Sequence, residues 1–387
     1  MSKLQELIKK LCPDGVEFRK LGEVCEIKRG VRVVKNDLIN DGKYPVFQNS
    51  LIPLGYYDKN NYPANITFVI SAGAAGEIGY TEEPIWAADD CLTIISPNNI
   101  INKFIYYCLI ANKLFFVSKV RRASVPRLSR TVVDNFEIPI PPLEVQNEIV
   151  RILDTFTLHT AELQAELQAR KEQYKYYRNK LLTFDENDER VKWMTLGEVS
   201  VNVCSGGTPS TSNKKYYQGH IPWLRTQEVD WKDVFYTKIK ISEDAIKNSS
   251  AKIIPPNCVI VAMYGATAGK TCINRIPLTT NQACCNLEIN KDIALYKYVY
   301  YWLYKEYYKL KALGEGSQSN ISGKKIKSYA IPIPPLSEQQ RIVSILDKFE
   351  SLVNDLSEGL PAEIAVVQEQ YEYYRNKLLT FRRMEKL

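Results

Sequence analysis

Histidine is almost absent from this chain of 387 residues, in which only His159 and His220 occur. Histidine is the side chain that most often carries protons near neutral pH, and it is a frequent metal ligand. The nine cysteines show no CxxC spacing of the kind found in zinc sites and redox pairs. The composition therefore predicts neither histidine-based catalysis nor a metal site. We expect the cysteines to be reduced, as in a cytoplasmic protein.

Long apolar runs are also missing. No stretch approaches 18 consecutive apolar residues, so we expect no membrane-spanning helix and no membrane partner. The opening residues MSKLQELIKKLCPDG place lysines in a short amphipathic pattern without a small-residue cleavage site, which does not predict a secretory signal. Because 45% of the residues are apolar, the chain is globular, and its length suffices for two domains.

A complete phosphate-binding loop is missing as well. The stretch VIVAMYGATAGKT (259–271) runs from an apolar segment into a glycine turn that closes on Gly-Lys-Thr. Such a loop needs four residues between its first glycine and the Gly-Lys pair, but only three separate Gly265 from Gly269, and Tyr264 stands at the required position. FVISAGAAGEIGY (68–80) has the same shape without the lysine and threonine. We therefore predict a turn required by the fold, with no nucleotide role.

The charge of the chain is mildly basic, with a net charge of +7. This value permits nucleic-acid binding without requiring it. The segment KVRRASVPRLSR (119–130) is more informative, because it carries five basic residues and no acidic residue. Either it is a solvated basic loop or it contacts nucleic acid.

An internal repeat organises the chain. IPIPPLEVQNEIVRILDTF (138–156) returns as IPIPPLSEQQRIVSILDKF (331–349), and QYKYYRNKLLTF (173–184) returns as QYEYYRNKLLTF (370–381). A weaker echo pairs KLGEV with TLGEV further upstream. The repeat divides the chain into variable and shared segments. The predicted boundaries are 1–137, 138–189, 190–330 and 331–387.

Each shared segment begins with prolines and continues as a predicted helix. Apolar residues recur alternately every four and three positions, which is a heptad seam. The first helix is expected over about 143–184, or roughly 60 Å at 1.5 Å per residue. The second contains a four-residue stutter beside Gly359 and Pro361, where we expect it to break or restart. The tandem TAEL and QAEL (160–167) consists of strong helix formers, and it predicts a helix whose length can change by one unit.

The variable segments predict α+β domains. Strand-like runs alternate with Gly, Pro and Asn turns, and each domain ends in an aromatic-rich helix that we expect to pack into a core. The predicted fold has two mixed-sheet domains separated by two long antiparallel coiled-coil helices, with pseudo-twofold symmetry from the repeat. Alignment through IPIPPL sets polar loop residues of the two domains opposite one another, and the pairs are Ser124 with Ser317, Arg127 with Asn320, and Ser129 with Ser322. Arginine favours guanine in the major groove, whereas asparagine and glutamine favour adenine.

The duplicated segments around two divergent domains resemble the specificity subunit of type I restriction–modification systems. LCPDGVEFRKLGEV, SGGTPSTS, IPWLRTQEV and GSQSNIS also resemble that family, so the likeness covers essentially the whole chain. The resemblance implies that each domain reads one half of a bipartite asymmetric site in double-stranded DNA. It further implies that the helices set the spacer and recruit two methyltransferase subunits, which restriction translocase/nuclease subunits join.

The resemblance also implies a non-catalytic chain without a cofactor, since ATP and S-adenosylmethionine belong to the other subunits. Two alternatives remain open. An enzyme with its own cofactor would bind S-adenosylmethionine unaided, although the chain has no methyltransferase motif of the Asn/Asp-Pro-Pro-aromatic type. A coiled-coil scaffold without sequence specificity would bind all DNA equally.

Two sets of site residues follow from the resemblance and the loop alignment. The residues expected to contact DNA are Lys28, Arg29, Arg32, Arg121, Arg122, Ser124, Arg127, Ser129, Arg130, Gly206, Gly207, Thr208, Ser210, Arg225, Tyr264, Thr267, Ser317, Gln318, Asn320 and Ser322. The residues expected to bind the methyltransferase recur in both repeats, and they are Tyr174, Tyr177, Arg178, Tyr371, Tyr374 and Arg375. The loop 119–130 lacks the Gln and Asn of GSQSNIS, so the two domains are expected to read different bases.

Overall fold

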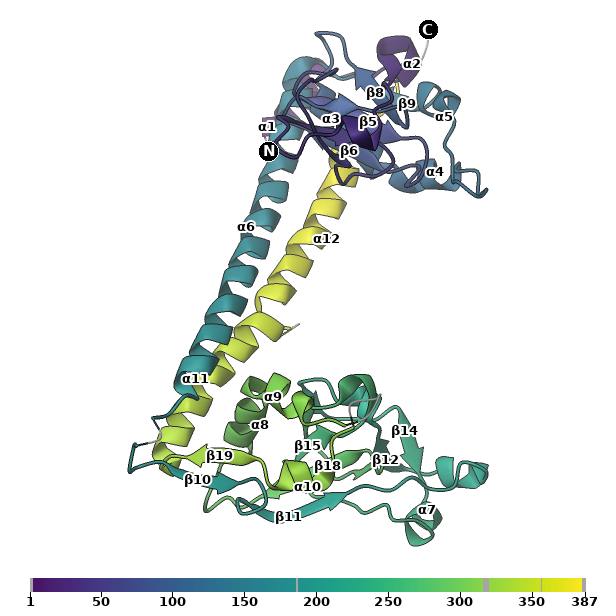
Figure 1. The fold of residues 1–387 in the computed structure, drawn as a ribbon. Helices are drawn as coiled ribbons and strands as arrows, with labels where there is room; N and C mark the ends of the chain where they lie inside the picture. Colours follow the sequence, from purple (N-terminus) through teal and green to yellow (C-terminus); the bar gives the residue numbers. More distant parts are fainter. Residues whose placement is uncertain (1–2, 186, 316–319, 356, 385–387) are drawn as a thin grey trace. The chain divides into compact units, whose positions relative to one another are not determined.

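The fold comes from a computed structural model (Figure 1). It describes residues 3–185, 187–315, 320–355 and 357–384. Contacts divide the chain into two compact units: the first comprises 1–165 with 363–387, and the second comprises 166–362. The first unit thus joins the first variable domain to the last helix of the chain.

The main sheet of the first unit has four antiparallel strands in the order β2-β8-β5-β6. Their bounds are β2 Glu26–Arg29, β8 Cys91–Ile95, β5 Ile66–Ile70 and β6 Ile78–Thr81. All five residues of β5 are buried, because this apolar run has a strand on each side and helix α3 (Asn102–Ala111) against it. Phe104, Tyr107 and other side chains of α3 complete the core.

A second, smaller sheet of the first unit follows the order β4-β3-β7. Strand β3 pairs antiparallel with β4 and parallel with β7, while β1 and β9 form a separate antiparallel pair. These strands are β3 Tyr44–Phe47, β4 Gly55–Tyr57, β7 Trp86–Ala87, β1 Phe18–Lys20 and β9 Glu137–Pro139. The remaining short helices are α1 Lys3–Leu11, α2 Leu21–Val24, α4 Lys113–Ser118 and α5 Arg130–Asp134.

The second unit repeats this strand order and adds one edge strand, β13, which pairs parallel with β16. Its sheets have the orders β11-β18-β15-β16-β13 and β14-β12-β17, with a separate β10-β19 pair. The strands are β10 Lys192–Thr195, β11 Ser200–Ser205, β12 Ile221–Leu224, β13 Asp233–Val234, β14 Ile239–Ile241, β15 Val259–Ala262, β16 Thr271–Asn274, β17 Thr279–Thr280, β18 Cys284–Ile289 and β19 Ala330–Ile333. The helices are α7 Glu243–Lys247, α8 Tyr296–Lys305, α9 Tyr307–Ala312, α10 Gly323–Lys327 and α11 Leu336–Asn354. The predicted α+β domains with mixed sheets are confirmed in both units.

The stretch that resembles a phosphate-binding loop is a hairpin connection between β15 and β16. Gly265 and Gly269 have positive φ angles of 78° and 84°, which glycine adopts without steric cost. Lys270 forms an ion pair with Asp230 (2.6 Å), and Thr271 is fully buried at the start of a strand. A phosphate-binding loop opens a helix, whereas this one continues as a sheet. The β5–β6 loop has the same glycine geometry, as predicted.

Helix α6 (Leu143–Leu181) has 39 residues and is the longest element of the described chain. It begins directly after two prolines and ends three residues before the predicted limit. The predicted seam residues are buried or half-buried except Tyr177. The last shared segment is split into α11 and α12 (Leu360–Leu378), and this split confirms the break expected beside Gly359.

Both parts of the last shared segment pack on α6, each within its own unit. In the first unit, Phe156 of α6 stacks on Tyr374 of α12, with ring centroids 5.5 Å apart. In the second unit, Phe349 of α11 stacks on Tyr177 of α6 at 5.4 Å. Phe156 and Phe349 are equivalent in the repeat, as are Tyr177 and Tyr374. The same phenylalanine–tyrosine contact is therefore made twice, and the two copies of the repeat exchange roles between the two contacts.

A buried glutamine of the repeat holds the domain helix in each unit. Gln146 and its equivalent Gln339 are fully buried. Gln146 accepts from the N–H of Ile101 (2.9 Å) and donates to two main-chain carbonyls (3.1 and 2.7 Å). Gln339 makes the same three bonds, accepting from the N–H of Leu295 (2.9 Å) and donating over 3.1 and 2.9 Å. The oxygen and the nitrogen of each buried glutamine amide are therefore both hydrogen-bonded.

An aspartate of the repeat, eight residues and about two turns after Gln146 on α6, holds the same helix. In the first unit, Asp154 accepts from the hydroxyl of Tyr107 (2.5 Å) and pairs with Lys103 (3.0 Å). Both partners lie on α3. The variable domain is thus fixed to the shared helix by an amide and a carboxylate that the repeat supplies.

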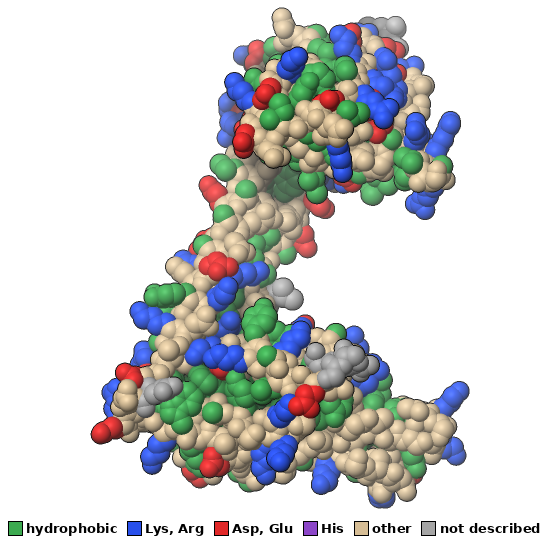
Figure 2. Space-filling view, viewed as in Figure 1, with side chains coloured by type: hydrophobic (Ala, Val, Ile, Leu, Met, Phe, Trp, Pro, Cys, Tyr) green, Lys and Arg blue, Asp and Glu red, His purple; other side chains and the backbone are tan. Residues whose placement is uncertain are grey.

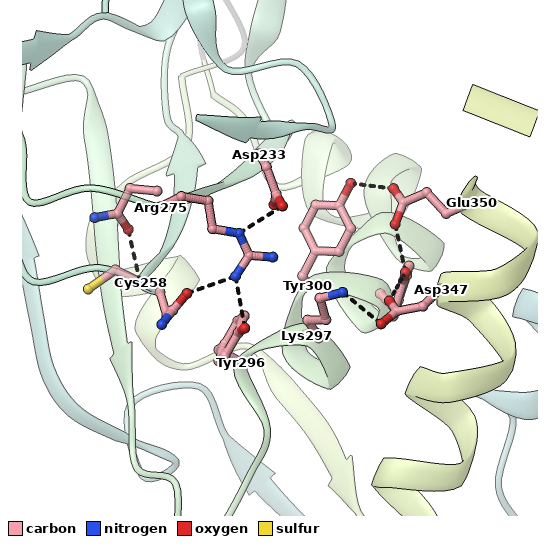
Figure 3. A network of polar contacts seen from close by, with 11 residues as sticks. Asp233, Cys258, Arg275, Tyr296, Lys297, Tyr300, Asp347 and Glu350 are labelled. Atoms are coloured by element: carbon pink, nitrogen blue, oxygen red, sulfur yellow. Dashed lines mark hydrogen bonds and ion pairs between the residues drawn. The ribbon is translucent and has the colours of Figure 1, made fainter. Parts of the chain in front are cut away.

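The second unit repeats this contact and extends it (Figure 3). Asp347 pairs with Lys297 and accepts from Tyr301, both at 2.6 Å. Glu350 accepts from Tyr301 (2.6 Å) and Tyr300 (3.3 Å). Burial and the neighbouring Asp347 raise the pKa of Glu350. The first unit has a threonine at this position of the repeat, so the buried glutamate is particular to the second unit.

Candidate nucleic-acid interface

The basic segment 119–130 of the first unit forms a closed, exposed loop, which we call the arginine loop. Arg121 and Arg127 exchange backbone hydrogen bonds of 2.9 and 3.1 Å across its neck. The N–H of Leu128 donates to Ser71 (2.8 Å), which fixes the loop against the end of β5. Its four arginines are exposed, and Figure 2 shows Lys and Arg side chains gathered where α4 and α5 lie in Figure 1.

The arginine loop and the end of β2 enclose a hollow of about 420 Å³. The lining residues predicted to contact DNA are Arg29, Arg121, Arg127, Ser129 and Arg130. The structure therefore brings together side chains that are about 100 positions apart in the sequence. Ser129 also caps α5, and Arg130 pairs with Asp134 (3.4 Å).

Other predicted DNA-contact residues lie near this hollow or on the loop itself. Lys28 on β2 is exposed and paired with Glu26 (2.9 Å). Arg32 is exposed and lies close enough to lower the pKa of Asp90. Arg122 and Ser124 are exposed on the arginine loop. Several exposed basic residues of the first unit thus lie on or near the arginine loop.

The equivalent loop of the second unit has the same attachment. The N–H of Ile321 donates to Met263 (2.9 Å) at the end of β15, which matches the bond from Leu128 to Ser71. Ser322 caps α10 as Ser129 caps α5. Asn320 is exposed, at the position that the alignment pairs with Arg127. Ser317 and Gln318, which were also predicted to contact DNA, lie outside the described residues.

The glycine pair of the second unit is buried rather than exposed. A side chain on Gly206 would come within 2.1 Å of the Thr280 carbonyl, and one on Gly207 within 2.2 Å of the Ala251 nitrogen. Gly206 thus lets the chain pack on the turn between β17 and β18, and Gly207 lets it pack on Ser250 and Ala251. Thr208, directly after them, is exposed and donates to Gln282 in that turn.

The other predicted residues of the second unit lie around the β15–β16 connection or the neighbouring loops. Tyr264 is 40% exposed, and Thr267 donates to the carbonyl of Thr226 (2.8 Å). Arg225 directly precedes Thr226, and its Nε is buried without a hydrogen-bond partner. Ser210 is exposed and bonded to another serine (2.8 Å).

The residues predicted to bind a partner differ in exposure. Tyr174 is buried, whereas Tyr177 and Tyr374 are 39% and 41% exposed. The guanidinium of Arg178 lies over the Tyr304 ring, 3.8 Å from its centroid. A substitution of Arg178 therefore also perturbs the domain core.

Arg375 and Tyr371 face each other in the first unit as Arg178 and Tyr174 do in the second. The guanidinium of Arg375 lies 5.3 Å from the centroid of the Tyr371 ring. Tyr176 and Tyr373, which are equivalent in the repeat but were not among the residues predicted to bind a partner, are 56% and 59% exposed. Their recurrence away from the heptad seam was the available signal.

In the part of the chain that the structure describes, no group of three or more His, Cys, Asp or Glu side chains is placed to hold a metal ion. The nine cysteines are unpaired, and burial raises the pKa of Cys25 and Cys91 to about 12. No described helix combines the length and apolarity needed to cross a bilayer.

Two divergent domains of one topology, each with a polar or basic loop beside its main sheet, define a protein with two separate recognition surfaces. The family model described as "Type I restriction modification DNA specificity domain" matches residues 13–173 and 189–366. The chain belongs to this family, the type I restriction–modification specificity subunits.

Similar proteins agree along the whole chain. The specificity subunit of the type I restriction enzyme EcoR124I/EcoR124II of Escherichia coli is 34% identical, with 100% of this chain and 99% of that one covered. The crystal structure of the S subunit of a type I restriction–modification system from M. genitalium has a TM-score of 0.63 at 17% identity, covering 94% and 96%. A chain from a study of complex assembly and conformational transition of the type I system has a TM-score of 0.60 at 19% identity, covering 95% and 98%.

Proposed function

We propose that this chain is the non-catalytic DNA-reading subunit of a type I restriction–modification complex, and that each unit reads one half of a bipartite asymmetric site. The observation that carries the proposal is that the two units share one strand order, apart from the added strand β13, but differ in loop chemistry. The loop fixed to β5 carries Arg127, and the loop fixed to β15 carries Asn320 at the equivalent position. Arginine suits guanine and asparagine suits adenine, so the two surfaces suit different bases.

The shared helices follow the two variable domains in the sequence. We propose that they form an antiparallel coiled coil with pseudo-twofold symmetry, and that their length sets the spacer. The support is the exchange of the stacking contacts, because Phe156 meets Tyr374 as Phe349 meets Tyr177. A twofold relation produces such reciprocal pairs.

The duplicated surface of these helices provides two equivalent sites for methyltransferase subunits. Tyr176 and Tyr177 pack edge to face (5.3 Å, 78°), and Tyr373 and Tyr374 do the same (5.2 Å, 77°). Exposed tyrosines are frequent anchors of protein interfaces. Restriction translocase/nuclease subunits join through the assembled complex. Replacing Tyr176 and Tyr373 by alanine should lower the number of bound methyltransferase subunits from two to none in native mass spectrometry, and two bound subunits would contradict this assignment.

The experiment that tests the function is methylation mapping. The chain is combined with its methyltransferase subunits, and the methylated sites are sequenced. The proposal predicts one bipartite motif with a fixed spacer. A scaffold without sequence specificity would instead leave random and genomic DNA equally bound, and S-adenosylmethionine binding by the isolated chain would indicate an enzyme.

A further inference from the structure

An acidic turn lies inside the basic surface of the first unit. Asp90 follows β7 and lines the hollow together with Arg29, Arg121 and Arg127. Arginines 29, 32 and 127 all stabilise its charged form, yet burial and Asp89 outweigh them and raise its pKa. Within the described residues, Asp90 forms no ion pair and its carboxylate accepts no hydrogen bond. Among the described residues, the Asp90 carboxylate therefore has no hydrogen-bond donor or ion-pair partner, although arginines lie near it.

The backbone holds this turn in place. The N–H and hydroxyl of Ser71 both donate to the carbonyl of Asp90, at 2.7 and 2.9 Å. The N–H of Cys91 closes the turn on Ala88 (2.9 Å). Oδ1 of Asp89 is buried without a hydrogen-bond partner. The backbone beside the Asp90 carboxylate is thus hydrogen-bonded to the end of β5.

A carboxylate at this place opposes the binding of phosphate. The surrounding arginines would attract the DNA backbone, and an unpaired negative charge beside them weakens that attraction. Its presence is accounted for if the carboxylate accepts a hydrogen bond that only a base can donate. The exocyclic amino group of cytosine is such a donor in the major groove, and carboxylates accept from it.

The equivalent turn of the second unit carries a different polar side chain, Gln282. Cys284 closes this turn on Asn281 (3.1 Å), as Cys91 closes the first. Gln282 of this turn is exposed, and its side chain accepts a hydrogen bond from the hydroxyl of Thr208. The sequence predicts that Thr208 contacts DNA. The alignment sets Gln282 opposite Asp89, and glutamine suits adenine.

We propose that these equivalent turns are base-reading elements, in which Asp90 accepts from the amino group of a cytosine and Gln282 contacts an adenine. The inference rests on the proposed function and adds residues outside the loops predicted from the sequence. Each residue specifies one position of its own half-site. Of the arginines that line the hollow with Asp90, Arg29 and Arg121 hold the phosphates.

The test is methylation mapping of the assembled complex with Asp90→Asn. Asparagine keeps the size of the side chain and adds a donor, so one position of the first half-site should change from cytosine toward adenine. The second half-site and the spacer should stay unchanged. Asp90→Ala should relax that position, with a loss of about tenfold to a hundredfold in base preference. Asp14→Asn is the matched control, because Asp14 is an exposed aspartate of the same unit outside the hollow, and it should leave the motif unaltered.

An unchanged motif with uniformly altered affinity would overturn the inference, since the carboxylate would then only tune the arginines. If the Asp90→Asn complex does not assemble, the test uses Gln282→Ala instead. One position of the second half-site should then lose its base preference. A second half-site with unaltered bases would refute the proposal. The proposed function fails separately, namely when the wild-type complex methylates no bipartite motif.

Discussion

Deleting Gln164 to Leu167, one QAEL unit of α6, should shorten the spacer of the recognised site. Four residues remove about 6 Å of helix, and they rotate the remainder by about 40° beyond a full turn. At about 3.4 Å per base pair, the expected change is one or two base pairs. Leu163 and Leu167 are the seam residues involved. The deletion leaves two consecutive seam steps of three, which overwinds the helix locally without breaking it.

The assay is methylation mapping of the wild type, the deletant and a variant with one additional QAEL unit. Both half-site sequences should be retained in all three, while the spacer shortens in the deletant and lengthens in the insertion. Replacing the exposed Gln164 and Glu166 by alanine is the matched control and should leave the spacer unchanged. An active deletant with the original spacer, or with altered half-site bases, would refute the ruler.

Three further predictions concern the recognition surface, the hairpin and the helix junction. Replacing all four arginines of the arginine loop by alanine should reduce the salt dependence of DNA binding by about three to four units of slope, and an unchanged slope in fluorescence anisotropy would count against phosphate contact. Lys270→Ala should leave ATP binding by the isolated chain undetectable in calorimetry, as in the wild type, because this lysine is paired with Asp230; micromolar binding that the substitution abolishes would show the hairpin interpretation to be wrong. Gln146→Leu leaves three main-chain groups without their hydrogen-bond partner and should lower the free energy of unfolding of the first unit by roughly 2–5 kcal/mol in chemical denaturation. The control Gln164→Leu, at an exposed position, should change it little. A loss below about 1 kcal/mol for Gln146→Leu would show that these hydrogen bonds do not hold the helix.

Most of the fold features that could be predicted were predicted from the internal sequence repeat. Its heptad spacing anticipated α6 and the burial of its seam, and the stutter beside Gly359 marked the interruption between α11 and α12. These features depend on residues close together in the sequence, where helical periodicity is readable. The alignment of Arg127 with Asn320 also agreed with the structure, since both loops are attached to the same strand position.

The parts that escaped prediction depend on strand pairing between distant segments. Asp90 approaches the arginine loop only because β8 pairs with β5 and Leu128 bonds to Ser71. No local pattern encodes that meeting. Gly206 and Gly207 have a packing role that their motif did not reveal, because Gly206 lies close against Thr280 and Gly207 close against Ala251.

The most direct test of the central claim is an exchange of one domain. Residues 190–330 are replaced by the corresponding domain of another family member, and the sites methylated by the assembled complex are mapped. The account predicts that the first half-site and the spacer are retained while the second half-site changes to that of the donor. A motif in which both halves change, or in which neither does, would contradict the assignment of one half-site to each unit.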